Sequence, residues 1–362
     1  MYDLVIVGGG PAGATLARLL GNEHRILILD RRDLGQPFSG GQEKCCGGLL
    51  APDAQSMLAG FGLGLPSSVL VGPQLFTVRT MDLAAGRERY YPRDYINVDR
   101  EKFDRWLVSL IPPRVERRWS TLFRDLEQRE KGYRVSFSQG GKDESVETRL
   151  VVGADGALSR VRAGLGMKLP MYIAIQEWFE AEKPLPYYSA IFDPKITDFY
   201  AWTIPKEETI LVGAAIPAGI DVQVRFELLK HKLGRHGYTL GKSLKRRGCH
   251  LVRPSSPREI CLGKDGIFLI GEAAGWISPS SAEGLSYAFR SALALARAIA
   301  GGKPRLLAHY RRQCRGLYLN ILGKLAKSPG MYWPFLRQMA MASGLFSLEL
   351  LGKDFHRETE EE

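Results

Sequence analysis

The sequence lacks the hydrophobic segments that direct a protein into a membrane or anchor it there. No basic stretch followed by an apolar core opens the chain, so we expect no signal peptide. No apolar run approaches the roughly 18 uncharged residues that a spanning helix needs, and even residues 291–300 carry Arg297. We therefore predict a cytoplasmic protein without a transmembrane helix.

Cysteine and histidine are also scarce. The five cysteines are odd in number and irregularly spaced, so reduced thiols are expected, and a pair between Cys249 and Cys261 stays open. The six histidines show no ligand spacing with cysteine or glutamate, and no G-x-S-x-G segment is present. A metal site and a serine hydrolase are therefore not expected.

Acidic residues are outnumbered by basic ones. The 362 residues carry 50 Lys and Arg against 39 Asp and Glu, a formal net charge of +11, and basic residues gather in 242–253 and 311–315. Such charge is either a solvated surface or a site for nucleic acid, anionic lipid or a phosphorylated substrate. No nucleic-acid-binding fold signature is present, so we expect no nucleic-acid partner.

The most informative segment is the first thirty residues. An apolar run at residues 4–7 leads into the glycine-rich turn 8–13, a helix-favouring segment at 14–20 and a second apolar run at 26–29 that ends in Asp30. This order binds the ADP half of a dinucleotide. Gly8 permits the turn, Gly10 lets the backbone approach the pyrophosphate, and Gly13 lets the helix pack on the strand. Ala12 belongs to the same turn, and Asp30 is placed to accept hydrogen bonds from ribose hydroxyls.

Two later segments repeat the pattern of a strand that runs into a small-residue turn. Residues 148–152 enter Gly153-Ala154-Asp155-Gly156, where Asp155 and Gly156 make a second dinucleotide contact or, alternatively, a helix-capping turn. Residues 266–270 enter Gly271-Glu272-Ala273-Ala274-Gly275, followed by Gly284 and a helical pattern at 286–300. Glu272 is a candidate contact to a ribityl chain, and the helix after Gly284 is a candidate to face a phosphate or a polar ring edge. The alternative is a purely structural βα unit.

Together with Asp99-Arg100 and Phe103-Asp104, these turns resemble the flavoproteins of the p-hydroxybenzoate hydroxylase-like superfamily. Within it, Lys44-Cys45-Cys46-Gly47-Gly48 and residues 200–205, Tyr-Ala-Trp-Thr-Ile-Pro, resemble the K-x-C-G-G and Y-x-W-x-F-P segments of the geranylgeranyl reductase family. The likeness is closer still to one bacterial branch of that family, on residues 46–55 and 271–275. Ile204 stands where the reductases usually have Phe, and Glu272 where most of the superfamily has Asp.

The resemblance implies an α/β flavoprotein with a Rossmann-like FAD-binding domain, an inserted β-sheet substrate domain and a helical C-terminal region. The expected FAD-binding domain comprises residues 1–64, 96–168 and 256–300; the substrate domain 65–95 and 169–255; and the helical region 301–362, with a frayed acidic tail. Strands are expected at 69–71, 75–78, 172–175 and 209–212.

The resemblance also implies non-covalent FAD and reduction of isolated double bonds in an isoprenoid lipid. Besides the residues of the three turns, it assigns Lys44, Gly47, Gly48 and Arg100 to the cofactor, and Arg31 is a further candidate for the adenosine phosphates. The alternative for Arg100 is an ion pair with Asp104 at i,i+4. No second G-x-G-x-x-G segment is present, so the electron donor is a transiently docking NAD(P)H, a ferredoxin or another reductase.

An isolated alkene accepts a hydride only if a proton is added. The candidate donors are Cys46, Tyr200 and an ordered water. A thiol in an apolar pocket stays protonated, and the alternative for Cys46 is simple packing. Tyr200 and Trp202, two apart on a strand, predict an aromatic wall for the lipid or core packing, and Pro205 is expected to end that strand or shape its exit.

The C-terminal region carries a basic amphipathic pattern. The apolar stripe consists of Tyr310, Cys314, Leu317, Ile321 and Leu325, and an aromatic stretch follows Pro329. Packing over the substrate domain is expected; peripheral contact with an anionic inner membrane is the alternative. An oxygen-using flavin hydroxylase or halogenase, and a flavin-holding protein that only binds a lipid carrier, remain the alternatives to a reductase.

Overall fold

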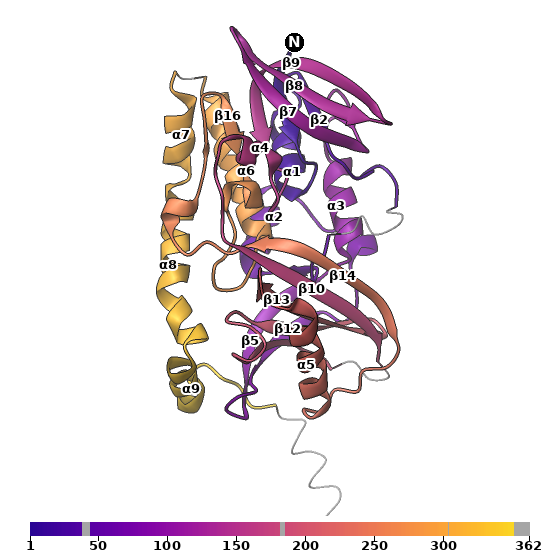
Figure 1. Ribbon diagram of the computed structural model, residues 1–362, viewed down its shortest axis with the longest axis vertical. Helices are drawn as coiled ribbons and strands as arrows, with labels where there is room; N and C mark the ends of the chain where they lie inside the picture. Colours follow the sequence, from indigo (N-terminus) through magenta and orange to yellow (C-terminus); the bar gives the residue numbers. More distant parts are fainter. Residues whose placement is uncertain (38–43, 182–184, 303, 351–362) are drawn as a thin grey trace, which may run out of the picture. The chain divides into compact units, whose positions relative to one another are not determined.

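The computed structural model describes residues 1–37, 44–181, 185–302 and 304–350 (Figure 1). The expected acidic tail at 358–362 lies outside these residues. The chain divides into two compact units. The first comprises Met1–Leu70, Val98–Tyr172 and Cys249–Ser328, and the second Val71–Asn97, Ile173–Gly248 and Pro329–Glu362.

The first unit is built on a sheet in the order β15-β16-β9-β1-β2-β6. Its strands are β1 (Tyr2–Val7), β2 (Ile26–Leu29), β6 (Glu116–Arg118), β9 (Lys142–Gly153), β15 (Gly263–Lys264) and β16 (Ile267–Leu269). From β16 to β6 all pairings are parallel, with Val5 opposite both Leu27 and Val151. The strands β1 and β2 are almost entirely buried because both faces of a parallel sheet are covered. The carboxyl ends of β1, β9 and β16 therefore meet at one edge.

Helices and an antiparallel extension complete this unit. The strands β7 (Thr121–Arg129) and β8 (Gly132–Gln139) form a hairpin that continues from β9, and β3 (Leu49–Leu50) is short. The helices are α1 (Pro11–Leu20), α2 (Pro52–Gly60), α3 (Arg100–Ser109), α4 (Arg160–Gly164), α6 (Leu285–Ala300) and α7 (Leu306–Gln313), and α8 (Arg315–Tyr332) begins here. Helix α1 packs along α6 (Figure 1).

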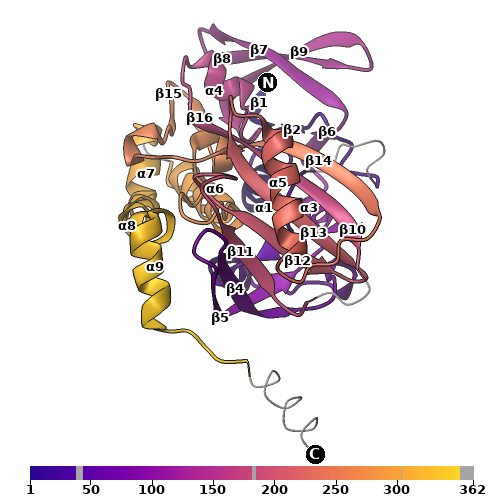
Figure 2. The ribbon, with the colours of Figure 1, turned by 60° about the horizontal axis from the view of Figure 1, so that its bottom comes forward.

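The second unit contains a sheet in the order β14-β10-β13-β12-β11-β4-β5. Its strands are β4 (Leu75–Asp82), β5 (Arg87–Asn97), β10 (Met171–Glu180), β11 (Tyr188–Phe192), β12 (Ala201–Lys206), β13 (Thr209–Pro217) and β14 (Ser243–Val252), and its helices are α5 (Val222–Gly234) and α9 (Pro334–Ser343). Helix α5 lies on this sheet, where Phe226, Leu229 and Leu233 pack against Ile210 and Val212 (Figure 2).

The α/β fold class is confirmed, and most expected elements are present. The strand expected at 69–71 is wrong: Ser67–Val69 form a 3-10 turn, and Leu70 makes only an isolated bridge, to Val98. Pro205 does not end its strand, since β12 continues to Lys206. Within the described ranges, no helix is both long and apolar enough to cross a membrane.

The C-terminal stripe does not pack as expected. Tyr310, Cys314, Leu317 and Ile321 are buried. Tyr310 contacts the ring of Phe268 and donates a hydrogen bond to the carbonyl of Leu269 at 2.9 Å. At Tyr310 the stripe therefore packs on the sheet of the first unit rather than on the substrate sheet, and the helix is interrupted at Cys314, between α7 and α8. The aromatic stretch after Pro329 packs as expected, because Tyr332 contacts the rings of Phe192 and Phe199 in the second unit.

Candidate functional site

The turn between β1 and α1 is held by contacts that only glycine permits. A Cβ on Gly13 would lie 1.9 Å from the carbonyl oxygen of Gly8, and one on Gly8 would lie 2.4 Å from the carbonyl oxygen of Ala154. Gly8 also has a φ of 110°, which favours glycine. By contrast, a Cβ on Gly10 would meet only Arg32 Nη2 within 4 Å, beyond its chain neighbours in the described structure. The space in front of helix α1 is therefore open, and a guanidinium lies beside it.

Helix α1 begins without a side-chain cap among the described residues, and Gly10 is its N-cap. Its first N–H groups and the positive end of its dipole are thus available to an anion. The helix contains Ala12 and Gly13, both buried.

The carboxylate of Asp30 is buried and fully engaged by the chain. It accepts hydrogen bonds from the backbone N–H of Gly9 at 2.8 Å and from the backbone and side chain of Arg32. Arg32 also forms an ion pair with Asp104 at 3.4 Å. Burial disfavours the charge of Arg32, but Asp30 and Asp104 outweigh it and raise its pKa. Arg31, the expected candidate, is exposed instead.

The second turn places one oxygen of Asp155 without a partner. Its Oδ2 accepts from the backbone N–H of Arg160 at 2.7 Å, at the start of α4, which is the capping role weighed as the alternative. Its Oδ1 is buried and has no hydrogen-bond partner in the part of the chain that the structure describes. Burial raises the pKa of Asp155, although hydrogen bonds from Ser159 and the backbone oppose the shift. Gly156 follows with a φ of 77°.

The third turn, Gly271–Ala274, joins the other two. A Cβ on Gly271 would lie 2.9 Å from the Cβ of Ala12, and one on Gly156 would lie 4.0 Å from Glu272 Oε2. Arg162 is buried and donates to the carbonyls of Ala273 at 2.9 Å and of Ala157. All three turns therefore lie together at the carboxyl ends of β1, β9 and β16. We name this group, with Asp30, Arg32 and Lys44, the strand-end site.

The segment after residue 43 is tied to this site by an ion pair. Lys44 Nζ lies 3.0 Å from Glu272 Oε2, and Glu272 raises the pKa of Lys44. The other oxygen of Glu272 accepts from the backbone N–H of Val252 at 3.2 Å. Gly47 and Gly48 follow; Gly48 has a φ of 64°, and its carbonyl accepts from the backbone N–H of Val98.

Arg100 makes the ion pair that was its alternative role. Its Nε lies 2.8 Å from Asp104 Oδ1, and its Nη1 donates to the Sγ of Cys46 at 3.2 Å. The surroundings of Cys46 are therefore not purely apolar, contrary to expectation. Arg32 and Arg100 share Asp104, so the two cations are held close to the same carboxylate.

The start of helix α6 differs from that of α1. Gly284 is its N-cap, but the carboxylate of Glu283 accepts from the backbone N–H of Ser286 at 2.7 Å and from its hydroxyl at 2.6 Å. An acid of the chain itself therefore occupies this helix end, which makes it a poor site for a phosphate.

In the second unit, Tyr200 and Trp202 belong to a buried aromatic group. Their ring centroids are 5.4 Å apart, and they are only 8% and 7% exposed. Tyr200 precedes β12, which begins at Ala201. The group, which we name the aromatic cluster, consists of Phe192, Phe199, Tyr200, Trp202 and Tyr332. The carbonyl of Pro205 accepts from Asn97 Nδ2 at 2.9 Å.

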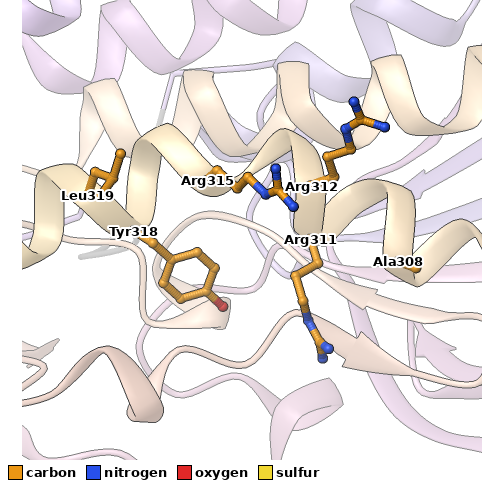
Figure 3. Close-up of a pocket in the computed structure, with 6 residues that line it drawn as sticks. All are labelled: Ala308, Arg311, Arg312, Arg315, Tyr318 and Leu319. Carbon is orange, nitrogen blue, oxygen red and sulfur yellow. The ribbon is translucent and has the colours of Figure 1, made fainter.

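A hollow of about 470 Å³ lies on the surface of helices α7 and α8 in the first unit. Its lining consists of Ala308, Arg311, Arg312, Arg315, Tyr318 and Leu319. Figure 3 shows Arg311 and Tyr318 extending to the same side of the helices, with Arg315 between them. We name it the arginine hollow; its lining contains three cations and no acid.

Sequence reasoning missed several residues that hold this arrangement. Arg32 was overlooked in favour of its neighbour Arg31, although the backbone N–H and the guanidinium of Arg32 both donate hydrogen bonds to Asp30. Arg162 was not singled out from the sequence. Cys45 and Cys249 were not connected, since 204 residues separate them.

The chain has a Rossmann-type α/β fold, and this fold is similar to that of solved flavin-dependent proteins. A geranylgeranyl bacteriochlorophyll reductase-like protein from Thermoplasma acidophilum superposes with a TM-score of 0.76 at 19% identity, covering 89% of this chain and 86% of that one. The p-nitrophenol 4-monooxygenase PnpA from Pseudomonas putida has a TM-score of 0.73 at 18% identity, covering 96% and 93%. The flavin-dependent brominase Bmp2 has a TM-score of 0.69 at 18% identity, covering 94% and 92%.

Sequence comparison gives the narrower assignment. No protein-family model matches the chain. Proteins named CbrA from Escherichia coli O6:H1 and from Shigella sonnei are each 42% identical to it, over 98% and 95% of this chain and 96% and 97% of theirs. The chain belongs to the CbrA family, which confirms the bacterial branch expected from residues 46–55 and 271–275.

Proposed function

We propose that the strand-end site binds FAD and that the protein is an FAD-dependent oxidoreductase. The observation that carries this proposal is the convergence of three glycine turns around an open helix start, beside a buried carboxylate oxygen without a partner among the described residues. The residues fit the cofactor. The N-terminus of α1, Gly10 and Arg32 would hold the pyrophosphate. Asp155 Oδ1 would accept a hydrogen bond from a hydroxyl of the cofactor.

The assignments of Asp30 and Glu272 are narrower than the sequence suggested. Each oxygen of Glu272 accepts one hydrogen bond from the chain and has capacity for a further donor, whereas each oxygen of Asp30 already accepts two. Glu272 would therefore contact the ribityl chain while holding Lys44, and Asp30 would accept a hydrogen bond from a ribose hydroxyl in place of one of those from Arg32.

We further propose that the substrate is a polyprenyl or other isoprenoid lipid and that its double bonds are reduced. When bound, reduced FAD supplies a hydride. The chain must then supply a proton, for which Cys46 and Tyr200 are the candidates. Arg100 fixes the position of the Cys46 sulfur through its hydrogen bond. Trp202 and Tyr200 would contact the lipid chain. These roles rest on the resemblance of residues 44–48 and 200–205 to the geranylgeranyl reductases.

The test is an anaerobic incubation of the chemically reduced holoenzyme with extracted isoprenoid lipids, followed by mass spectrometry. We expect a product heavier by two hydrogen atoms. The variants Cys46→Ser and Tyr200→Phe identify the proton donor, since the essential one abolishes turnover while FAD content is retained. Comparing NADH, NADPH and ferredoxin as reductants then identifies the physiological class of donor.

Two other results would overturn the reductase proposal. Rapid NAD(P)H oxidation with a flavin–oxygen adduct, and no saturated lipid, would identify an oxygen-using hydroxylase or halogenase instead. Tight lipid binding that neither turns over nor responds to flavin reduction would identify a lipid-carrier-binding protein.

For the partner surface, we propose that the arginine hollow binds anionic lipid headgroups at the inner face of the membrane. Three exposed cations lie beside Leu319 and Leu322, which are 69% and 49% exposed. This combination suits a surface with phosphates above acyl chains. We expect co-sedimentation with phosphatidylglycerol vesicles but not with phosphatidylcholine vesicles.

A matched pair of variants tests this surface. Replacing Arg311, Arg312 and Arg315 with Ala should abolish vesicle binding. The control removes three exposed cations of the β7–β8 hairpin, Arg124, Arg129 and Lys131, and should retain it. Equal loss in both variants would show that only net charge matters and would contradict a site at the hollow.

A further inference from the structure

Cys45 and Cys249 are brought together from distant parts of the sequence. The Sγ of Cys249 lies 3.3 Å from the carbonyl oxygen of Cys45, to which it donates a hydrogen bond. All five cysteines lie within the described ranges and are thiols. Cys45, on the segment after residue 43, and Cys249, on β14, are therefore neighbours and form a pair that a two-electron oxidation can close.

The two thiols differ in charge environment and in exposure. The hydrogen bond from Cys45 and the cations Lys44 and Arg100 lower the pKa of Cys249, whereas the same hydrogen bond and burial raise the pKa of Cys45. Cys45 is buried, whereas Cys249 is only partly buried. Cys249 is thus both the more exposed thiol and the one with the lowered pKa, and Cys45 is positioned to resolve the product.

We propose that Cys45 and Cys249 form a redox-active dithiol that exchanges with low-molecular-weight disulfides such as oxidised glutathione. The Cys249 thiolate attacks one sulfur of the disulfide, which releases one glutathione thiolate and leaves a mixed disulfide on Cys249. Cys45 then loses its proton and attacks the Cys249 sulfur, which releases the second glutathione. The two protein thiols are oxidised by two electrons, and one disulfide is reduced to two thiols.

Closure of this disulfide would restrain the residues that flank Cys45. Lys44 pairs with Glu272 and Cys46 contacts Arg100, so a covalent link from Cys45 to β14 would hold both contacts in place. We expect slower release of bound FAD from the oxidised protein. This consequence, unlike the dithiol itself, rests on the proposed function.

The test titrates the purified full-length protein with mixtures of reduced and oxidised glutathione, traps thiols by alkylation and maps them by mass spectrometry. We expect the intact protein to lose two hydrogen atoms and to yield a Cys45–Cys249 linked peptide. Cys314, which is fully buried, should stay unlabelled under native conditions and reports that the protein remains folded.

Single variants separate the two thiols. Cys45→Ser should accumulate a stable glutathione adduct on Cys249, because no resolving thiol remains. Cys249→Ser should take up no glutathione at Cys45, and Cys46→Ser should still form the linked peptide. A persistent adduct in the unmodified protein, or a disulfide that includes Cys46, would overturn the proposal. None of these measurements needs flavin or lipid turnover, so their failure is distinct from failure of the proposed function.

Discussion

The strand-end site and the aromatic cluster solve different physical problems. The strand-end site has polar groups that the described structure leaves without a hydrogen-bond partner: the first N–H groups of α1 and one oxygen of Asp155. The aromatic cluster leaves little space, because its rings contact one another and a Cβ on Gly213 would lie 2.4 Å from the Trp202 indole. We infer that substitutions in the aromatic cluster chiefly cost folding free energy, and that those in the strand-end site chiefly cost cofactor affinity.

Trp202→Ala should give the largest loss of stability. It removes a buried indole from contact with Tyr200 and Gly213, for which a loss of about 3–5 kcal/mol in the free energy of unfolding is expected. The folded fraction should retain its FAD content. Trp333→Ala is the control: its indole is 62% exposed, so urea denaturation should detect little change. Loss of FAD from folded Trp202→Ala would break the distinction between the two regions.

Gly13→Ala should lower both the free energy of unfolding and the affinity for FAD. The new Cβ would lie 1.9 Å from the Gly8 carbonyl oxygen, so α1 must move away from β1, at a cost of about 1–3 kcal/mol in the free energy of unfolding. Because the helix start moves with it, we expect FAD to be lost on gel filtration. Gly60→Ala, also in a helix but with no described atom within 4 Å of its Cβ, should leave both quantities nearly unchanged.

Residues whose role is local were predicted well from the sequence. The glycine turns, the helix after Gly10, the strand before Asp30 and the strand that ends at Gly153 follow from spacing and residue type. Gly8 and Gly13 could be identified without knowing any distant contact, because the tight turn between β1 and α1 requires glycine at these positions. The fold class therefore follows from short segments of the sequence.

Residues whose role depends on distant partners were not predictable in this way. Arg162 joins the carbonyls of Ala157 and Ala273, and nothing local marks which carbonyls a buried guanidinium will meet. The choice between Arg31 and Arg32 depended on side-chain direction after the strand. The strand expected at 69–71 was wrong because a strand also needs a neighbouring strand to pair with, and Leu70 makes only an isolated bridge.

Arg162→Met should lower the free energy of unfolding and weaken FAD binding at the strand-end site. The change leaves the carbonyls of Ala157 and Ala273 without this donor, and an unsatisfied buried acceptor costs about 1–3 kcal/mol. Arg160→Met is the control, since Arg160 is exposed and its side chain bonds only the carbonyl of Phe123 among the hydrogen bonds observed. Thermal unfolding with and without added FAD measures both effects. Equal destabilisation by the two variants would contradict a joining role for Arg162.

Asp155→Asn should give the smallest change in stability, and in the opposite direction. Because burial raises the pKa of Asp155 in the folded state, its stabilising contribution is fully present below the ordinary carboxyl pKa of about 3.9 and is lost as the pH rises through the folded value. The amide does not titrate, so the flavin-free variant should exceed the unmodified protein by about 1 kcal/mol at neutral pH and lose this advantage in acid. Its FAD affinity should nevertheless fall, because an amide N–H₂ at the position of Oδ1 cannot accept a hydrogen bond from a hydroxyl of the cofactor.

Urea denaturation from pH 3 to pH 8 measures the stability of the Asp155→Asn variant, and FAD titration measures its affinity. A pH-independent difference in stability, or unchanged FAD affinity, would show that the unpartnered oxygen is not held in wait for the cofactor.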